Sequence, residues 1–355
     1  MSPSERKTIV VVGGGVIGLT TAIVLSDTHQ VKIIARRFGE RNESAQAVAM
    51  WHLHLVPETE TVLRWAETTL KKLIAIHTEF PEAGVELIKG VELFRKRSKK
   101  VPVWSNIPPL FEMLSDKEIS RYNTYDQFVM ADNKLALSAD WPVTWGFRSQ
   151  RPAVCMKTYL DWLMSLVAEK NVELDCDIVR DLADMARCYD YVINCTGLGA
   201  RELTDDNGFV QHKEQYFVLQ ADDDAPLEYI RDHEFPTGIA YVIPRGGEVI
   251  VGGSVEEGIE DFVPVMNWNS IAKRNAVYVP WLRTRLTYDR SRGYDPYRRI
   301  VGCVSPARVT GVRLETQSVK HGGTIIHNYG HGGSGFSLSW GCAEEVGKLI
   351  EAQSS

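Results

Sequence analysis

The sequence lacks the marks of a membrane, nucleic-acid-binding or disulfide-stapled protein. No apolar run approaches the roughly 20 residues that a membrane span requires. The 46 acidic and 40 basic residues give a net charge of −6, which does not favour nucleic acid or an anionic membrane. The six cysteines show no CxxC or metal-type spacing, so we expect reduced thiols. We find no signal peptide and no SKL-type peroxisomal address, and therefore expect a cytoplasmic protein.

The composition is that of an ordinary globular protein with a substantial core. Hydrophobic residues make up 44% and charged residues 24% of the 355 positions. This length predicts about two domains, or one domain with a large insertion. No internal repeat and no low-complexity linker marks a boundary between them.

The first motif is a strand, a glycine turn and a helix near the start of the chain. Residues 8–12 form a β-branched, apolar run, which is typical of a buried parallel strand. The pattern GxGxxG follows, formed by Gly13, Gly15, Val16, Ile17 and Gly18. A helical segment and a second buried strand at 31–35 complete the unit. In this context the glycines permit a tight turn, close approach to a pyrophosphate and close helix packing, so we predict a dinucleotide site.

The residues after the second strand leave the identity of the dinucleotide open. An acidic residue that binds the ribose 2′-hydroxyl is usual there, but Arg36 and Arg37 occupy the position. Arginine accommodates the 2′-phosphate of NADP, and it equally stacks on an adenine ring or reaches a phosphate of FAD. This end of the chain does not distinguish NADP from FAD.

A second glycine turn near the end of the chain favours FAD. The stretch HNYGHGGSGFSLSWG, residues 327–341, lies between an apolar strand and an amphipathic helix. A nicotinamide dinucleotide needs one such turn, whereas a flavin dinucleotide can use one at the pyrophosphate and one at the isoalloxazine ring. The N-terminus of the following helix would stabilise the negative charge that reduction places on the flavin.

Four segments spread over the chain resemble the D-amino-acid oxidase family of flavoproteins, which includes D-aspartate oxidase. They are GGGVIGLTTA, YVINCTGLGAREL, YVIPRGGEVIVGG and HNYGHGGSGF…WGCAEEV, and they occur in the family's order. The resemblance implies an α/β fold in which a discontinuous Rossmann-like FAD-binding domain is interleaved with an α+β substrate domain built on an antiparallel sheet. We expect the FAD-binding domain at 1–56, 152–205 and 300–355, and the substrate domain at 57–151 and 206–299.

Local patterns agree with this division. Residues 189–197 are typical of a buried strand that ends at Gly197, a third place where backbone can approach the cofactor. Residues 172–179, which include Ile178, alternate and predict a strand of a small sheet over the adenine. Residues 248–255 predict a strong strand in the substrate domain, and residues 59–80 a helix.

The resemblance and the two glycine turns together predict the cofactor-binding residues. Arg36, Arg37 and Ser44 would hold the adenosine diphosphate end together with the first glycine turn. The flavin ring would be held by the second turn and by the segment where the family has an Ala-Gly pair near the flavin. The remaining predicted cofactor contacts are Ala49, Met50, His52, Ile178, Gly197, Gly332, Gly333, Ser334, Gly335, Phe336 and Ser337.

The resemblance also implies the chemistry, which is hydride transfer from the substrate α-carbon to flavin N5 and reoxidation by O2. No strong base is needed if the amine binds in its neutral form. Tyr241 matches the family tyrosine that binds the substrate carboxylate, and Gly333 matches the glycine that accepts from the amine. The partner arginine is missing, because Ser305 falls at its position. Either Arg308 replaces it, or the substrate has no free α-carboxylate there, and we favour the second interpretation.

Two histidines, His52 and His54, stand where the family has other residues. If their segment is a strand, both point to the same side, toward flavin and substrate. A metal site is not expected, since no third ligand is near in the sequence. We predict a structural role or substrate contact, and we place His54 in the candidate catalytic set with Tyr241, Gly333 and Arg308. His331 is interpreted as a turn residue.

The first hypothesis is therefore an FAD-dependent oxidase of C–N bonds that acts on a modified amino acid or a cyclic amine, with O2 as acceptor. The alternatives are a true D-amino-acid or D-aspartate oxidase with a displaced arginine, a flavin-scaffolded cyclisation or rearrangement without net redox, and an NADP-binding protein. A non-catalytic binding module is the least favoured. The resemblance allows a homodimer, and no feature of the sequence decides it.

Overall fold

The computed structural model describes residues 6–96, 100–123, 141–236, 238–257, 268–285 and 298–354. The chain divides into two compact units. Unit 1 comprises residues 1–85, 154–212 and 304–355, and unit 2 comprises residues 86–153 and 213–303. Residues 57–85 and 206–212 make their contacts in unit 1, whereas the sequence analysis assigned them to the substrate domain. Among the described helices, none is both long and apolar enough to cross a membrane.

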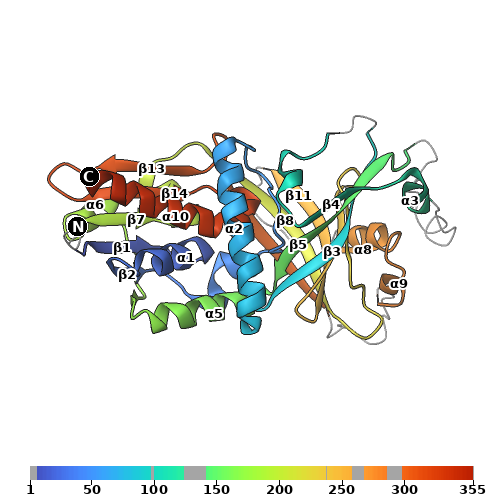
Figure 1. Cartoon of the computed structure of the whole chain (residues 1–355), viewed down its shortest axis with the longest axis horizontal. Helices are drawn as coiled ribbons and strands as arrows, with labels where there is room; N and C mark the ends of the chain where they lie inside the picture. Colours follow the sequence, from blue (N-terminus) through green and yellow to red (C-terminus); the bar gives the residue numbers. More distant parts are fainter. Residues whose placement is uncertain are drawn as a thin grey trace. The chain divides into compact units, whose positions relative to one another are not determined.

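Unit 1 is built on a six-stranded sheet with the strand order β13-β14-β7-β1-β2-β6. In chain order its elements are β1 (Thr8–Val12), α1 (Val16–Leu25), β2 (Gln30–Ile34), α2 (Glu60–Glu79), α5 (Met156–Glu169), β6 (Glu173–Asp175), α6 (Leu182–Ala186), β7 (Tyr191–Asn194), α7 (Ala200–Thr204), β13 (Arg313–Ser318), β14 (Thr324–Tyr329) and α10 (Gly335–Ser354). The neighbours from β14 to β6 are parallel, and β13 is antiparallel to β14. Figure 1 shows these elements in the colours of the sequence.

Helices cover both faces of this sheet. Val10 and Val12 of β1 pack with Leu182 and Ala186 of α6 on one face. Alternate residues point to the other face, where α1 lies so close that a Cβ on Gly18 would be 3.5 Å from Cγ1 of Val11. The predicted strands at 8–12 and 31–35, the predicted helix after the first glycine turn and the last helix are therefore confirmed. The predicted Rossmann-like arrangement is confirmed with them.

One strand prediction in unit 1 needs correction. Residues 172–179 do not form a strand of a separate small sheet, because only Glu173–Asp175 are extended and they pair with β2 at the edge of the main sheet. Two hydrophobic side chains of this region, Leu174 and Ile178, are 40% and 50% exposed. The alternation that predicted a strand is real, but an edge position leaves its outward side chains uncovered.

Unit 2 contains an eight-stranded mixed sheet with the order β12-β8-β11-β10-β9-β3-β5-β4. The elements are β3 (Val85–Phe94), β4 (Leu110–Met113), α3 (Asp116–Arg121), β5 (Trp145–Val154), β8 (Phe209–Gln220), β9 (Tyr229–Asp232), β10 (Ala240–Arg245), β11 (Glu248–Glu257), α8 (Trp268–Asn275), α9 (Trp281–Arg285) and β12 (Arg298–Arg308). Strand β10 is antiparallel to both of its neighbours, β9 and β11, whereas β3 is parallel to β9.

One face of this sheet is an apolar core. Val242 and Val251, on β10 and β11, pack with Ile271 and Ala272 of α8 and are fully or nearly fully buried. Strand residues alternate between faces, so the neighbours of these valines in sequence point to the opposite face. That opposite face carries polar side chains, and it is described with the candidate site.

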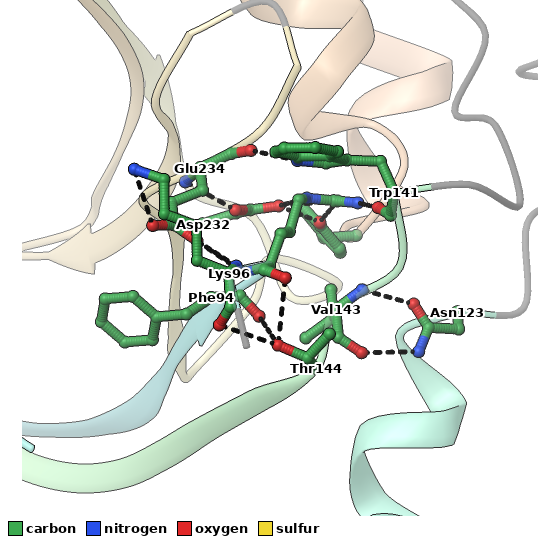
Figure 2. Close-up of polar contacts among 10 residues, drawn as sticks. Phe94, Lys96, Asn123, Trp141, Val143, Thr144, Asp232 and Glu234 are labelled. Carbon is green, nitrogen blue, oxygen red and sulfur yellow. Dashed lines mark hydrogen bonds and ion pairs between the residues drawn. The ribbon is translucent and has the colours of Figure 1, made fainter. Parts of the chain in front are cut away.

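Hydrogen bonds from side chains to the backbone hold the segment that precedes β5. Figure 2 shows the side chain of Asn123 bonded to both backbone groups of Val143, at 2.8 and 2.9 Å. The hydroxyl of Thr144 donates to the carbonyl oxygen of Arg95 at 3.1 Å. The guanidinium of Arg95 is fully buried and binds the equally buried carboxylate of Asp232 at 2.8 and 3.0 Å. The end of β3 is thus tied to β9 and to the start of β5.

Candidate active site

Three turns that contain glycine lie at the same edge of the sheet in unit 1. The strands β1, β7 and β14 are parallel neighbours, so their carboxyl ends lie together. Each strand is followed by one turn, which begins at Gly13, at Gly197 and at Gly330 respectively. The order in which strands are added to the sheet reverses at β1, because β2 lies on one side of β1 and the later strand β7 on the other. Open α/β sheets bind their ligands at this kind of switch point.

Three glycines of the first turn lie too close to neighbouring backbone for a side chain to fit. Gly13 has a φ of +123°, and a Cβ there would be 2.3 Å from the carbonyl oxygen of Cys195, just after β7. A Cβ on Gly18 would be 1.9 Å from the carbonyl oxygen of Gly13. Gly14 was not predicted as a required glycine, yet its Cβ would be 2.8 Å from the carbonyl oxygen of Arg37. The turn, the helix and two strand ends therefore meet at backbone distance.

Ser44 is held beside the N-terminus of α1. Its Oγ accepts a hydrogen bond from the backbone N–H of Val16 at 3.1 Å, and a Cβ on Gly15 would be 2.9 Å from that oxygen. Asn42, which the sequence analysis missed, caps the short turn Glu43–Gln46 by accepting from the Ser44 N–H at 2.8 Å. An Asn two residues before a predicted site serine was the available signal, because such residues start Asx turns.

The predicted adenine-side residues lie on the surface of unit 1. Arg36 and Arg37 follow β2 and are both exposed. Ile178 is half-exposed, beyond the end of β6, which pairs with β2. The sulfur of Cys176 lies 3.5 Å from the carbonyl oxygen of Arg36, so the segments after β2 and β6 are in contact. These groups offer charge and apolar surface to a ligand along this side of the sheet.

The C-terminal turn packs tightly against the segment 52–55. A Cβ on Gly332, whose φ is +54°, would be 2.5 Å from the carbonyl oxygen of Leu55. A Cβ on Gly333 would be 2.7 Å from the ring of His54. The hydroxyl of Ser334 accepts from the N–H of His54 at 2.7 Å and donates to its carbonyl at 2.9 Å. The glycines of this turn therefore permit close packing of two backbone segments at the start of α10.

Ser337 repeats this pattern one helical turn later. Its hydroxyl accepts from the N–H of His52 and donates to the His52 carbonyl, both at 2.8 Å. The other predicted residues here are buried: Ala49, at a φ of +51°, is 6% exposed, Met50 7% and Phe336 5%. Gly335 is the first residue of α10, and Gly197, at a φ of +56°, has no atom within 4 Å of a Cβ. Open space at Gly197 is compatible with a bound group.

The histidine segment is not a strand, which corrects the sequence analysis. His52 and His54 lie in irregular backbone that the two serines hold, with ring centroids 6.3 Å apart. His331 precedes the turn Gly332–Ser334, as expected of a turn residue. Burial lowers the pKa of His331 to about 3, so its imidazole is neutral at physiological pH. Its Nε2 has no hydrogen-bond partner in the described part of the chain.

Arg308 is bound within unit 1. Its Nε donates to the carboxylate of Asp206 at 2.8 Å, and its Nη1 donates to the carbonyl of Gly311 at 2.9 Å. The guanidinium carbon lies 5.7 Å from the centroid of the Tyr329 ring, whose hydroxyl also donates to Asp206. These contacts give Arg308 a structural role, which does not support the alternative in which it replaces the missing arginine at Ser305.

Tyr241 lies on the polar face of the sheet in unit 2. Its ring lies against the backbone of Gly252 and Gly253, where a Cβ would be 2.1 and 2.5 Å from ring atoms. The side chain is 6% exposed, and its hydroxyl has no hydrogen-bond partner in the described structure. Desolvation raises the pKa of Tyr241 well above its usual value, with a smaller contribution from the charge of Glu214. The tyrosine is therefore a neutral hydrogen-bond donor.

Comparisons with known proteins identify the family. The model of FAD-dependent oxidoreductases matches residues 8–349. D-Amino-acid oxidase of Rubrobacter xylanophilus is 31% identical over 97% of this chain and 95% of that protein. D-Aspartate oxidase of Homo sapiens is 28% identical over 98% of this chain and 95% of that protein. The structure of glycine oxidase from Geobacillus kaustophilus superimposes with a TM-score of 0.72 at 16% identity, covering 98% of this chain and 95% of that one.

These matches confirm the resemblance. They also identify the cofactor as FAD, which Arg36 and Arg37 alone did not distinguish from NADP. The fold with two sheets and interleaved segments is also the one expected. NADP is set aside, because the matched family is defined by its use of FAD. The chain is an enzyme of the DAO family of FAD-dependent oxidoreductases.

Proposed function

We propose that this enzyme oxidises a C–N bond of an amino acid or an amino-acid-derived amine. The observation that carries the proposal is the convergence of three glycine-bearing turns at the carboxyl edge of β1, β7 and β14. Bound FAD would supply a two-electron oxidation of the substrate C–N bond to an imine, with O2 as the final acceptor and H2O2 as its product.

The residues of unit 1 fit such a cofactor. The backbone N–H groups of the first turn and of the N-terminus of α1 would hold the pyrophosphate, with Ser44 fixed beside them. Arg36, Arg37 and Ile178 would lie along the adenosine end. The C-terminal turn, residues 332–337, together with Ala49, Met50 and His52, would contact the flavin ring, where the N-terminus of the 20-residue helix α10 favours negative charge.

The substrate remains to be assigned between two classes. In the first, a modified amino acid or a cyclic amine lacks a carboxylate at the position where Ser305 replaces the family arginine. In the second, the substrate is a D-amino acid, as the names of the relatives suggest, and another cation binds its carboxylate. Tyr241 would donate to the substrate in both cases, and the Gly333 carbonyl would accept from its amine.

Anaerobic mixing of the purified yellow protein with D-alanine, D-aspartate and D-proline, and with their amides and decarboxylated analogues, tests the function. We expect at least one amine to bleach the flavin, and H2O2 to appear when air is admitted. A flavin that dithionite reduces but none of these amines bleaches would contradict the proposal. Product formed without flavin reduction would instead support the rearrangement without net redox.

A further inference from the structure

The polar face of the sheet in unit 2 contains a buried arginine that has no counter-ion among the residues that the structure describes. Arg231, on β9, is 8% exposed. Its buried Nε has no hydrogen-bond partner among the described residues, and the contact found for its guanidinium in these residues is with the ring of Tyr241. A buried charge without a partner strongly disfavours the folded state. A fold that retains one therefore indicates a ligand that supplies the missing charge.

Two other buried arginines of unit 2, Arg95 and Arg151, are bound by carboxylates. Asp232, on the opposite face, is bound by Arg95 and by the hydroxyl of Tyr278. Arg151, on β5, binds Glu92 and the hydroxyl of Tyr229. Among these buried arginines, Arg231 alone lacks an anion.

Glu92 is a candidate counter-ion, since it lies opposite Arg231 in the register of β3 and β9. Its carboxylate is already used, because one oxygen accepts from Arg151 and the other contacts Nε2 of His233. Burial is the main cause that lowers the pKa of His233, so this histidine is neutral. The cluster of Arg151, Arg231 and Glu92 thus has one positive charge in excess.

Tyr241 lies beside this excess charge. Arg231 and Tyr241 are direct partners in the register of β9 and β10, so their side chains share one face. The guanidinium carbon is 6.0 Å from the centroid of the Tyr241 ring. The Tyr241 hydroxyl is the second buried donor here without a partner. A cation and a neutral hydroxyl, both donors, match a planar anion that accepts several hydrogen bonds.

We propose that Arg231 and Tyr241 form a carboxylate-binding pair, and that the substrate therefore carries a free carboxylate. The inference rests on the proposed function for what the substrate is, and it selects amino acids over amines that lack a carboxylate. Arg231, on β9, would then bind the substrate carboxylate in place of the arginine missing at Ser305, and Arg308 would not. Two other buried cations of unit 2 fit less well. Arg274 binds the carbonyl of Gly253, on β11. The Nζ of Lys213 also has no partner among the described residues, but Lys213 lies on β8, which is next to neither β9 nor β10.

The test separates binding from turnover by using propionate and propionamide, which have no amine to oxidise. Calorimetric titration of the FAD-loaded enzyme should show binding of propionate and much weaker binding of propionamide. The Arg231→Met variant should bind propionate roughly tenfold to a hundredfold more weakly, because it loses charge-assisted hydrogen bonds. Arg299→Gln is the matched control, since Arg299 is on the same sheet with its side chain 65% exposed, and it should bind propionate as the wild type does.

A second readout distinguishes ligand binding from a structural role. If Arg231 awaits an anion, Arg231→Met removes a buried unpaired charge, and the melting temperature of the ligand-free enzyme should stay the same or rise. A structural arginine would give a lower melting temperature. Arg231→Lys, which keeps the charge, should retain part of the propionate binding.

The outcomes are distinct from those that test the proposed function. Absence of propionate binding by the wild type, or equal binding by Arg231→Met, overturns the inference even if amines bleach the flavin. Propionate binding that depends on Arg231, without bleaching by any amine, would support the inference and contradict the oxidase function.

Discussion

Two sets of buried polar groups, one in each unit, differ in whether they have hydrogen-bond partners. In unit 1 the hydroxyls of Ser44, Ser334 and Ser337 are all bonded to backbone groups of neighbouring turns. In unit 2 two donors on one face of the sheet, at Arg231 and Tyr241, have no partner in the described structure. Internally satisfied groups build a rigid backbone surface, whereas unsatisfied donors are held ready for a ligand. We infer that unit 1 is shaped for the cofactor and unit 2 for the substrate.

The largest effect is expected from a substitution that disrupts the backbone packing of the first glycine turn in unit 1. Gly18→Ala places a Cβ 1.9 Å from the carbonyl oxygen of Gly13, so the turn and α1 must separate. We expect a protein that purifies without FAD or does not fold, measured as flavin absorbance per chain. Gly347→Ala is the control, because its Cβ would be 3.9 Å from Leu25. It should keep FAD and gain up to about 1 kcal/mol of stability from helix propensity.

The next largest effect is expected on stability, when the buried ion pair of Arg151 and Glu92 in unit 2 is broken. Arg151→Met leaves the carboxylate of Glu92 buried without its cation, and we expect the free energy of unfolding to fall by about 3–5 kcal/mol in urea titrations. Arg148→Gln breaks a half-exposed pair with Glu118 and should cost at most about 1 kcal/mol. Equal losses would show that burial does not set the value of these pairs. Arg151→Met should differ in sign from Arg231→Met.

Acid should destabilise unit 1 through His331. Burial holds its pKa at about 3 in the folded state, whereas the unfolded chain protonates near its ordinary value of 6.5. The unfolded state thus binds more protons between these values, and stability falls as the pH is lowered from about 6.5 toward 3, by up to about 1.4 kcal/mol per pH unit. His331→Gln should flatten this slope, and the exposed His321→Asn should not. Identical slopes in all three proteins would contradict the burial of a neutral imidazole.

A smaller effect is expected where a hydroxyl joins two segments of unit 1. Ser337→Ala removes one donor and one acceptor from the backbone of His52, and we expect a loss of about 1–2 kcal/mol in chemical unfolding. Ser165→Ala removes only a bond to a carbonyl three residues earlier in α5 and should be nearly neutral. A Ser337→Ala variant as stable as Ser165→Ala would show that the segment 52–55 is not held by α10.

Local patterns predicted most of unit 1 because its signals are short-range. The buried strand 8–12, the glycines of the first turn and the last helix each appear within a few residues of one another. The sequence did not predict that Ser334 and Ser337 bind the segment 52–55, since these contacts join residues about 280 positions apart. The side chains of His52 and His54 were expected on one side only if their segment were a strand, but it is irregular backbone held by those same serines.

The site in unit 2 was only partly predictable. Tyr241 was found by resemblance, but Arg231 was not, because nothing near it in the sequence shows that its charge is unpaired. Its isolation follows from pairing with β3 and β10, and from Glu92 being taken by Arg151 on a third strand. The available signal was YIRD, residues 229–232, in which two adjacent opposite charges must point to opposite faces of a strand that is buried on both.

The most direct test compares the two arginines that are candidates for the substrate carboxylate. Anaerobic stopped-flow reduction by the amino acid that bleaches the wild-type flavin should be measured for Arg231→Met and Arg308→Met. We expect Arg231→Met to raise the half-saturating substrate concentration roughly tenfold or more, and Arg308→Met, whose partner is Asp206, to leave it nearly unchanged. The reverse result would show that Arg308 binds the carboxylate and would contradict the assignment of this role to unit 2.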